Sequence, residues 1–463
     1  MLDRIDLAPL AYSGLNRDLE LCSSLGSPIQ KARFPLTEVG AMGLSANTSA
    51  GGDPPGAVLI IVENLPVPVD RRVWSEATAL RQAGYTVSVI CPKGRGYDKA
   101  YEQIDGVHIY RHPRGVEGSG AVTYLLEYTV ALFWQFVLSL KVAHRHGFDI
   151  LQACNPPDLT FLIAIFYKFF FGKKFLFDQH DPSPELYEVK FGRRDFFYRL
   201  LLLFERWTFR LADGVLATNP TLEQQAVERG GMPPDRVWIV RSVPDVRRFS
   251  QVKPDLSVRR TFRYLVGYVG MMADQDGVDL LVKAMEHIVK RMHRTDIACL
   301  IIGDGPEAGR VRTLTGELGI ADNVEFAGYI SGDALPAMLA ACDIGVVPDP
   351  PNACNVVMSM IKVFEYMALG LPFVLFDLAQ ARADAGDAGL VVAEPTPRAL
   401  GEGILALLED EVGRERMRNS GRKRAYGEFQ WEVEKRSLLA AYAQLVPRRA
   451  RAHAGTPANS NAP

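Results

Sequence analysis

The sequence predicts an α/β protein with two domains, each a parallel sheet doubly wound with helices, that face each other across a cleft. Three observations lead to this fold class. Short apolar runs alternate with helical segments along most of the chain. The alternation restarts after a polar interruption near residues 241–263, and 463 residues are enough for two or three domains of roughly 150 residues. Because ligands bind at the carboxyl ends of strands in such sheets, the predicted site is the cleft.

The alternation begins at Ala57–Val62, an apolar run that predicts a buried strand. The next segment, Arg71–Ala83, has helical spacing and stops at Gly84, a residue type that often ends helices. Helical or loop segments separate the strands that follow, as a parallel sheet requires. These further strands of the first domain are predicted at Tyr85–Cys91, Val107–Tyr110, Ile150–Cys154, Lys174–Phe177, Gly214–Ala217 and Val237–Val240.

The polar stretch after Val240, interrupted by Pro244 and Pro254, predicts the boundary between the domains. Strands of the second domain are predicted at Tyr264–Val269, Ala298–Ile302, Val324–Ala327, Ile344–Val347, Pro372–Phe376 and Gly389–Val392. The predicted organisation is a disordered extension (1–56), a first domain (57–245), a linker (246–263), a second domain (264–428), a C-terminal helix that packs back on the first domain (429–446) and a disordered tail (447–463).

Composition excludes several classes of protein. The chain has 52 Lys and Arg against 54 Asp and Glu, a formal net charge of -2, so it has no global attraction to nucleic acid, which we do not expect as a partner. The six cysteines form no Cys-x-x-Cys pair, so neither a disulfide framework nor a zinc ribbon is predicted. The longest charge-free apolar stretch, Tyr128–Leu140, is too short to span a membrane, which takes about 20 residues. With no secretory signal pattern, a cytoplasmic protein is expected.

Six motifs in a fixed order carry a family resemblance. The resemblance rests on the segments Glu63–Trp74, Asn155–Asp158, Asp178–Leu186, Ile302–Glu307, Val324–Tyr329 and Lys362–Pro372. The first three are similar to the acceptor domain, and the last three to the donor domain, of bacterial family 4 (group 1) glycosyltransferases. The resemblance implies the GT-B fold, in which two Rossmann-like domains face each other. It also implies retaining transfer of a sugar from a nucleoside-diphosphate sugar, in the synthesis of bacterial surface polysaccharides or glycoconjugates.

The segment that begins at Lys362 supplies the best-supported site residues. Lys362 and Glu365 are three residues apart, so on a helix they share one face and offer a cation and an acceptor to one ligand. The resemblance assigns Glu365 to the ribose hydroxyls and Lys362 to the diphosphate of the donor, and it makes Glu365 part of the active site. The alternative is an ordinary surface ion pair.

Some positions depart from the family pattern. The family often has a second glutamate eight residues before Glu365, and here Val357 stands there. The loop after the first strand of the second domain often carries two cations, but here it has Met271 and Gln275 at about those places. The departures are compatible with a different way of binding the sugar or with a weakened enzyme.

Main-chain N–H groups can bind phosphate where cations are missing, in a Gly-rich turn at a helix N-terminus. Gly270 and Gly277 are therefore candidate donor-binding residues, helped by Lys362 and Arg382. A plain turn between strand and helix is the alternative.

A second glycine turn, Gly303-Asp304-Gly305, follows another apolar strand. The resemblance places its three residues beside the donor, with Tyr329 as a wall for the base. Simple turn chemistry is the alternative explanation of the glycines.

In the first domain, His180 and Asp181 follow a predicted strand and are expected at the cleft. A histidine can stabilise developing charge near neutral pH, and His180 resembles the active-site histidine of the family. Asn155 belongs to another matched motif on the acceptor side.

Arg71 and Arg72 place two cations in the first turn of a helix, where the helix dipole disfavours them. An anion docked there, a phosphate of the donor or acceptor, would explain both arginines. The alternative is a solvated pair or one neutralised by Glu63 or Glu76.

The segment 190–210 has six basic and two acidic residues interleaved with aromatic and aliphatic ones. Such an amphipathic helix fits an anionic membrane surface, and the apolar segment Tyr128–Leu140 and the cluster Phe169–Phe171 add similar surfaces. This predicts a peripheral protein on the inner membrane face, with a lipid-linked acceptor. The alternative is helices that cover a sheet with one apolar side.

The sequence therefore predicts a glycosyltransferase that uses a nucleotide sugar as co-substrate, with no cofactor and no required metal, since protein groups can meet the charge of the diphosphate. Two alternatives remain open. One is a nucleotide-sugar epimerase on the same fold, which needs no acceptor. The other is a catalytically weakened partner subunit that recruits another transferase to the membrane.

Overall fold

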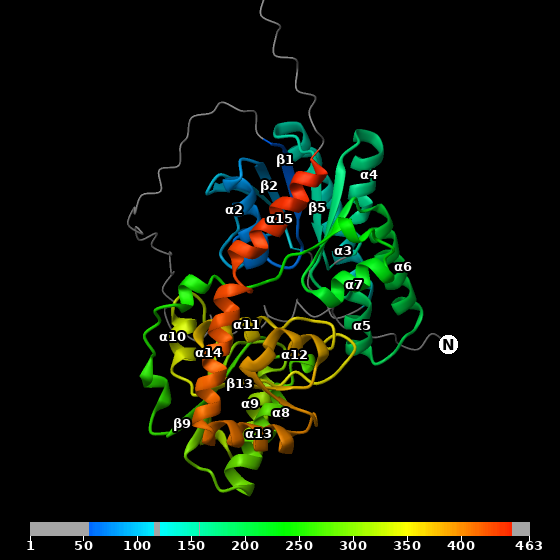
Figure 1. Cartoon of the computed structure of the whole chain (residues 1–463). Helices are drawn as coiled ribbons and strands as arrows, with labels where there is room; N and C mark the ends of the chain where they lie inside the picture. Colours follow the sequence, from blue (N-terminus) through cyan, green and yellow to red (C-terminus); the bar gives the residue numbers. More distant parts are fainter. Residues whose placement is uncertain (1–54, 115–120, 157, 447–463) are drawn as a thin grey trace, which may run out of the picture.

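A computed structural model describes residues 55–114, 121–156 and 158–446 of the chain. They form two α/β domains, one above the other in Figure 1, each built on its own sheet. The predicted α/β class with two doubly wound domains is confirmed. The disordered segments predicted at 1–56 and 447–463 lie almost wholly outside the described residues.

The first domain contains an eight-stranded sheet in the order β3-β4-β2-β1-β5-β6-β7-β8. All neighbouring strands are parallel except β3 and β4. The strands are β1 (Ala57–Ile61), β2 (Thr86–Pro92), β3 (Tyr101–Ile104), β4 (Val107–His112), β5 (Ile150–Cys154), β6 (Lys174–Gln179), β7 (Gly214–Ala217) and β8 (Val237–Ile239).

Strand β3 was not predicted from the sequence. It is a short, half-exposed edge strand that pairs antiparallel with β4 through the two-residue turn Asp105–Gly106. Both turn residues have positive φ, 47° and 81°, as two-residue hairpins favour. The Asp-Gly pair before Val107 was therefore the available signal.

The second domain contains a six-stranded, all-parallel sheet in the order β11-β10-β9-β12-β13-β14. Its strands are β9 (Tyr264–Val269), β10 (Ile297–Ile302), β11 (Val324–Gly328), β12 (Ile344–Val347), β13 (Phe373–Phe376) and β14 (Gly389–Val392). Apart from β3, the observed strands of both sheets either coincide with the predicted ones or differ at an end by one or two residues.

Helices cover both sheets. In the first domain they are α2 (Arg71–Gln82), α3 (Ala121–Arg145), α4 (Phe161–Phe171), α5 (Ser183–Phe191), α6 (Phe196–Leu211) and α7 (Pro220–Glu228). The helices that follow in the chain are α8 (Val278–Glu286), α9 (Ala308–Glu317), α10 (Ala334–Ala340), α11 (Ile361–Leu369), α12 (Ala379–Ala385), α13 (Pro397–Glu409), α14 (Glu411–Gly427) and α15 (Trp431–Leu445). Among the described residues, no helix combines the length and apolarity needed to cross a membrane.

Helix α2 shows how local sequence sets these elements. Asp70 caps it by accepting a hydrogen bond from the Val73 N–H at 3.0 Å, which stabilises a helix by about 1 kcal/mol. Val73, Ala77 and Leu80 recur at helical spacing and are buried in the first core. The buried face places the start of α2 beside the strand ends of the first sheet.

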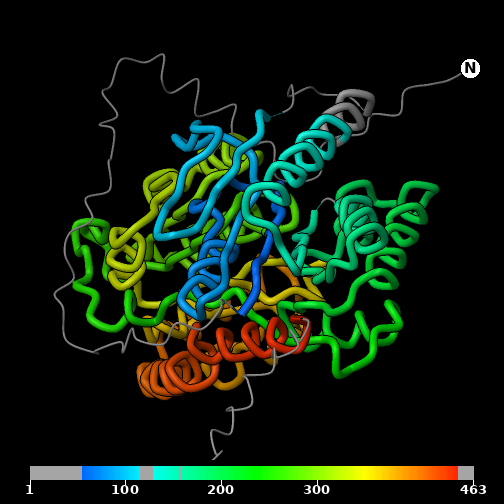
Figure 2. The backbone as a smooth tube through the Cα atoms, turned by 90° about the horizontal axis from the view of Figure 1, so that it is seen from above, coloured from blue at the N-terminus to red at the C-terminus, as the bar shows by residue number. Residues whose placement is uncertain are grey.

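The chain passes between the domains twice. Val240 is buried in the first core and Val246 in the second, so the first passage is short. The predicted linker 246–263 needs correction, because Val246 and Phe249 are part of the second core. The second passage follows α14, which packs on α11, and ends in α15, whose apolar side is buried against α2, β7 and β8 of the first domain (Figures 1 and 2).

Candidate active site

Helix α11 carries Lys362 and Glu365 at the second domain's side of the site. Every residue from Lys362 to Leu369 is buried, and the helix ends at Gly370 with a φ of 68°. Lys362 Nζ lies 2.7 and 2.9 Å from the two carboxylate oxygens of Asp349, just beyond β12. The two residues are therefore not a surface ion pair, the alternative raised by their spacing.

Glu365 is buried, and the described part of the chain places no cation within hydrogen-bond distance of its carboxylate. Burial raises its pKa to about 7, although the charges of Arg71, Arg248 and Lys362 act in the opposite direction. The nearest of these is Arg71, from the first domain, whose Nη1 lies 3.7 Å from Glu365 Oε1. Glu365 thus keeps acceptor capacity for a ligand between the domains.

The glycine loops at the ends of β9 and β10 pack backbone to backbone. A Cβ on Gly303 would collide with the carbonyl oxygen of Gly270, and one on Gly305 would lie 2.5 to 2.8 Å from Met272 main-chain atoms. The Gly270 N–H donates to the Ile302 carbonyl at 3.1 Å. That N–H is therefore not free for a phosphate, which corrects the role predicted for Gly270.

Gly277 and Asp304 also contribute to the close main-chain contacts of these loops. Gly277 has a φ of 65°, and a Cβ there would collide with the carbonyl oxygen of Pro348. The Asp304 carboxylate accepts from the Gly305 N–H at 2.8 Å, and its carbonyl accepts from the Met272 N–H at 3.1 Å. The turn-chemistry alternative accounts for these contacts.

The loop that lacks the family's cations is held by its main chain. The carbonyl of Met271 accepts from Tyr268, and that of Gln275 accepts from Asn355. The Asp276 carboxylate accepts the Ala273 N–H at 3.0 Å, and burial raises the pKa of Asp276. This loop therefore carries an acid, Asp276, close to the places where the family often has two cations.

Val357, at the place of the family's first glutamate, belongs to a contact between the domains. Its side chain packs against the first core, and its carbonyl accepts from Asn219 Nδ2 at 2.9 Å. Thr221 of α7 donates to Gln380 of α12 at 2.6 Å, a second link of the same kind. A glutamate at Val357 would place a charge in this apolar contact.

Two predicted donor residues are engaged elsewhere. The ring of Tyr329 lies beneath the guanidinium of Arg95 from the first domain, 5.7 Å from its Cζ. Arg382 pairs with Asp377 at 2.8 Å, and both are exposed. No contact between described residues joins Arg382 to Lys362 or Glu365, so the structure does not bring it to this pair.

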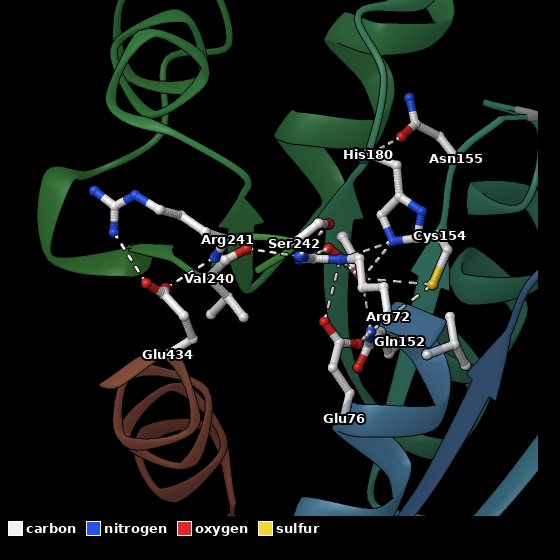
Figure 3. Close-up of polar contacts among 12 residues, drawn as sticks. Arg72, Glu76, Gln152, Cys154, Asn155, His180, Val240, Arg241, Ser242 and Glu434 are labelled. Carbon is white, nitrogen blue, oxygen red and sulfur yellow. Dashed lines mark hydrogen bonds and ion pairs between the residues drawn. The ribbon is translucent and has the colours of Figure 1, made fainter. Parts of the chain in front are cut away.

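His180 directly follows β6 in the first domain, and its ring points toward Arg72 and Cys154 (Figure 3). Its Nε2 is 2.7 Å from Asp178 Oδ2. Burial lowers the pKa of His180, but the Asp178 charge and hydrogen bond raise it by more, so the net direction is upward. Burial would raise the pKa of Asp178, yet Arg72 and His180 hold it below its ordinary value.

The adjacent arginines Arg71 and Arg72 have different roles. Arg72 is 7% exposed, and its guanidinium contacts Asp178 at 2.6 Å, Glu76 at 3.2 Å and the Val240 carbonyl at 2.6 Å. The anion role predicted for Arg72 is therefore wrong, because Asp178 and the Val240 carbonyl accept its hydrogen bonds and Glu76 pairs with its charge. Arg71 is 57% exposed and stays available beside Glu365.

Asn155 positions the turn that carries His180. Its Oδ1 accepts the N–H groups of His180 at 2.7 Å and Asp181 at 3.2 Å, and its Nδ2 donates to Asp158. Asp181 is half-buried, and burial raises its pKa to about 6. Asn155 therefore acts on the main chain rather than toward a ligand.

Cys154, Asp178 and His180 offer potential metal-ligand atoms within 4.8 Å of one another. The guanidinium of Arg72 already lies against the same carboxylate. A metal ion would share the space of a fixed cation, so the donor set does not fit one.

Sequence reasoning missed Asp349, Asp178, Gln152 and Tyr442 as parts of the site. Gln152 donates to Glu76 at 2.7 Å and to Asp178 at 3.0 Å, and it accepts from the Tyr442 hydroxyl. A polar residue in the apolar strand β5 was the available signal for Gln152. Tyr442 had none, because it lies on α15 at the far end of the chain.

The comparisons with known proteins agree on the class. A family model described as Glycosyltransferase Family 4 matches residues 69–248, and one described as Glycosyl transferases group 1 matches residues 263–410. Sucrose-phosphate synthase from Thermosynechococcus elongatus superimposes with a TM-score of 0.70 at 20% identity, over 84% of this chain and 98% of that one. Anabaena HepE in complex with UDP-glucose superimposes with a TM-score of 0.64 at 14% identity, over 84% and 100%.

Together the fold and the matches define a glycosyltransferase with the GT-B architecture. The chain belongs to the family 4, or group 1, glycosyltransferases, as the sequence motifs indicated.

The curated relatives are distant. An uncharacterized glycosyltransferase of Methanocaldococcus jannaschii is 22% identical over 388 residues, covering 77% of this chain and 89% of the relative. The D-inositol 3-phosphate glycosyltransferase of Salinispora tropica is 27% identical over 254 residues, 51% of this chain and 52% of the relative. A GDP-mannose-dependent phosphatidylinositol monomannoside mannosyltransferase of Mycobacterium tuberculosis is 26% identical over 201 residues, 41% and 51%. Against the last two, the chain spans about half of the relative's length.

Proposed function

We propose that this glycosyltransferase moves a sugar from a nucleoside-diphosphate donor to an acceptor hydroxyl with retention of configuration. The observation that carries the proposal is the meeting of buried Glu365 with Arg71 across the domains, with His180 on the facing domain. HepE, which shares the fold, binds UDP-glucose according to the description of its structure. The bond from the anomeric carbon to the diphosphate breaks, a bond to the acceptor oxygen forms, and the acceptor proton passes to the leaving diphosphate.

The charges support separate roles in this reaction. Glu365 accepts hydrogen bonds from the ribose, and His180 lines the sugar side. Lys362, now bonded to Asp349, and exposed Arg71 supply positive charge near the diphosphate. We propose that these protein cations replace a metal, so EDTA should leave the rate unchanged. A rate that falls with EDTA and returns with Mg²⁺ would contradict the metal-free arrangement.

The test of the transferase is an assay with a panel of UDP- and GDP-sugars, with and without membrane extract. We expect acceptor-dependent release of nucleotide, reduced about 100-fold or more by Glu365→Ala if Glu365 contacts the donor. The matched control is Glu317→Gln, an exposed glutamate on α9. Conversion of the donor without an acceptor would identify an epimerase. No turnover under any condition would favour a recruiting subunit.

We further propose a lipid-linked acceptor, used in the synthesis of a bacterial surface glycoconjugate at the inner membrane face. The exposed side of α6 carries Arg199, Leu203, Arg206, Trp207 and Arg210 along one stripe. Within the described part of the chain, its three arginines form no ion pair, whereas Arg193 and Arg194 nearby are paired with acids.

Helix α4 extends this surface beside α6 (Figure 1). Phe169, Phe170 and Phe171 at its end are among the most exposed apolar residues described, and Phe169 is 86% exposed. A basic and aromatic surface binds anionic lipid better than neutral lipid. The name of the mycobacterial relative, a phosphatidylinositol monomannoside mannosyltransferase, is compatible with such an acceptor.

Vesicle sedimentation tests the membrane proposal. The protein should bind vesicles with anionic lipid and lose much of this binding when Arg199, Arg206 and Arg210 are changed to Gln. A control variant, Arg416→Gln with Lys423→Gln on α14, removes exposed charge from the opposite domain. Equal binding to neutral vesicles, or equal loss in both variants, would refute the assigned surface.

A further inference from the structure

His180 contacts the protein through one of its two ring nitrogens. Within the described residues, the imidazole makes its polar contacts through Nε2, which lies 2.7 Å from Asp178 Oδ2. A carboxylate oxygen and an unprotonated ring nitrogen would both be acceptors at that distance, so Nε2 must carry the proton. Arg72 Nε, although 3.1 Å from Nε2, then donates to Asp178 Oδ2 at 3.3 Å instead. Nδ1 is the nitrogen left for a ligand.

The Asp178 carboxylate is itself held on both oxygens. Arg72 Nη2 donates to Oδ1 at 2.6 Å, and Gln152 Nε2 donates to Oδ2 at 3.0 Å. Arg72 cannot turn away, because Nη1 donates to the carbonyl of Val240 at 2.6 Å. A carboxylate fixed in this way holds the imidazole of His180 in one orientation. It also favours one neutral tautomer, the one protonated at Nε2.

The last link comes from the C-terminal helix. The Tyr442 hydroxyl of α15 donates to Gln152 Oε1, which directs the amide nitrogen of Gln152 toward Glu76 and Asp178. The same helix is fastened to the first domain by Glu434, which accepts the Arg241 N–H at 2.8 Å (Figure 3). A helix that follows the whole donor domain in sequence thus closes the network behind His180.

We propose that Arg72, Gln152 and Tyr442 are positioning residues, which hold His180 in the orientation that directs Nδ1 to an oxygen of the donor. The proposal rests on the transfer reaction proposed above. Protonated Nδ1 would donate a hydrogen bond to that oxygen, while Nε2–H stays on Asp178. Losing the Tyr442 hydroxyl should loosen Gln152 and Asp178 without changing the donor's own contacts.

The full chain offers a matched pair of variants. Tyr442→Phe removes the hydroxyl that bonds Gln152, whereas Tyr85→Phe removes a hydroxyl from the neighbouring ring, 5.9 Å away centroid to centroid, with no bond to the network. In the sugar-transfer assay, Tyr442→Phe should lower kcat about fivefold, equivalent to one hydrogen bond of about 1 kcal/mol, with the donor KM unchanged. Tyr85→Phe should leave both constants unchanged. Equal effects of the two variants on kcat would overturn the proposal.

A second measurement needs no turnover. In ¹⁵N NMR spectra of the ligand-free protein, the His180 signals, identified by their loss in His180→Gln, should show a protonated Nε2 that exchanges slowly. Tyr442→Phe and Arg72→Lys should speed this exchange, and Tyr85→Phe should not. A neutral His180 protonated at Nδ1 would refute the geometry even if transfer is observed. The expected spectrum with no transfer would instead refute the proposed function and leave the geometry standing.

Discussion

The two domains hold the charged groups of the site in different ways. In the first domain, the Arg72 guanidinium is enclosed by the carboxylates of Asp178 and Glu76 and by a main-chain carbonyl. In the second domain, Lys362 pairs with Asp349 and lies over the ring of Tyr268, while among the described residues the cation nearest to buried Glu365 is 3.7 Å away. The charges of the first group are balanced within the domain, whereas Glu365 in the second group can still accept hydrogen bonds from a ligand. The comparison indicates that the first domain holds its charged side chains in a fixed arrangement, whereas the second keeps charged groups available to bind the donor.

The largest expected effect comes from breaking the enclosed group. Arg72→Met leaves Asp178 and Glu76 buried without their cation, and losing one partner of a buried pair costs about 3–5 kcal/mol. The free energy of unfolding, measured with urea, should fall by this amount. Arg71→Met, one residue earlier and exposed, should cost less than about 1 kcal/mol. Similar losses in both variants would remove the contrast between the domains.

The second effect concerns pH and Glu365. Its pKa is about 7 in the folded protein against an ordinary value of 4.5, because burial disfavours the charge. The folded state therefore binds more protons than the unfolded state between pH 4.5 and 7, and stability falls as pH rises through this window. The difference between the two pKa values is equivalent to about 3 kcal/mol of stability over the whole window.

Urea unfolding at pH 5 and pH 7.5 measures this effect. Wild-type protein should lose about 2 kcal/mol more between these pH values than Glu365→Gln, which cannot ionise, because the two pH values span most of the window. Exposed Glu317→Gln should follow wild type. A Glu365→Gln variant with the wild-type pH dependence would show that Glu365 is ionised throughout, already paired like the carboxylates of the first domain.

The smallest effect is expected for the pair beside the donor. Lys362→Met leaves Asp349 without its partner, at a cost of about 1–3 kcal/mol. The donor KM should rise, because a diphosphate loses its cation. The control is Lys283→Met, which breaks a half-exposed pair with Asp279 on α8 and should cost about 0.5 kcal/mol. If Lys362→Met lowered the free energy of unfolding as much as Arg72→Met, the charged groups of the two domains would not differ in the way proposed.

The sequence was most informative where the structure depends on local spacing. The strands of both sheets follow from apolar runs, and Lys362 and Glu365 share one helix, so their periodicity located them. The partner of Lys362 was missed, because Asp349 is brought close only by the path of the loop between β12 and α11. The role of Arg72 was misjudged for a related reason. Its ion-pair partners come from the buried face of α2 and from β6, and the carbonyl of Val240 accepts a further hydrogen bond.

Contacts between distant segments left no local signal. Val357 looked like a missing sugar ligand, yet its surroundings come from the other domain. Gly270 looked like a phosphate-binding turn, yet its N–H is used by the neighbouring loop. In both cases a family motif indicated the correct region, and packing decided what the residue does there.

Because α15 packs into the first domain, that domain is formed by two segments that are far apart in the sequence. Leu438, Ala441, Tyr442 and Leu445 fill part of the core behind β7, β8 and α2. A fragment that stops at residue 245 would expose that part of the core and should aggregate when expressed alone. Fusing residues 431–445 to it through a flexible linker should restore a closed domain. Conversely, the donor domain is bounded by residues 246 and 429, so it is the half to exchange between family members as a single cassette.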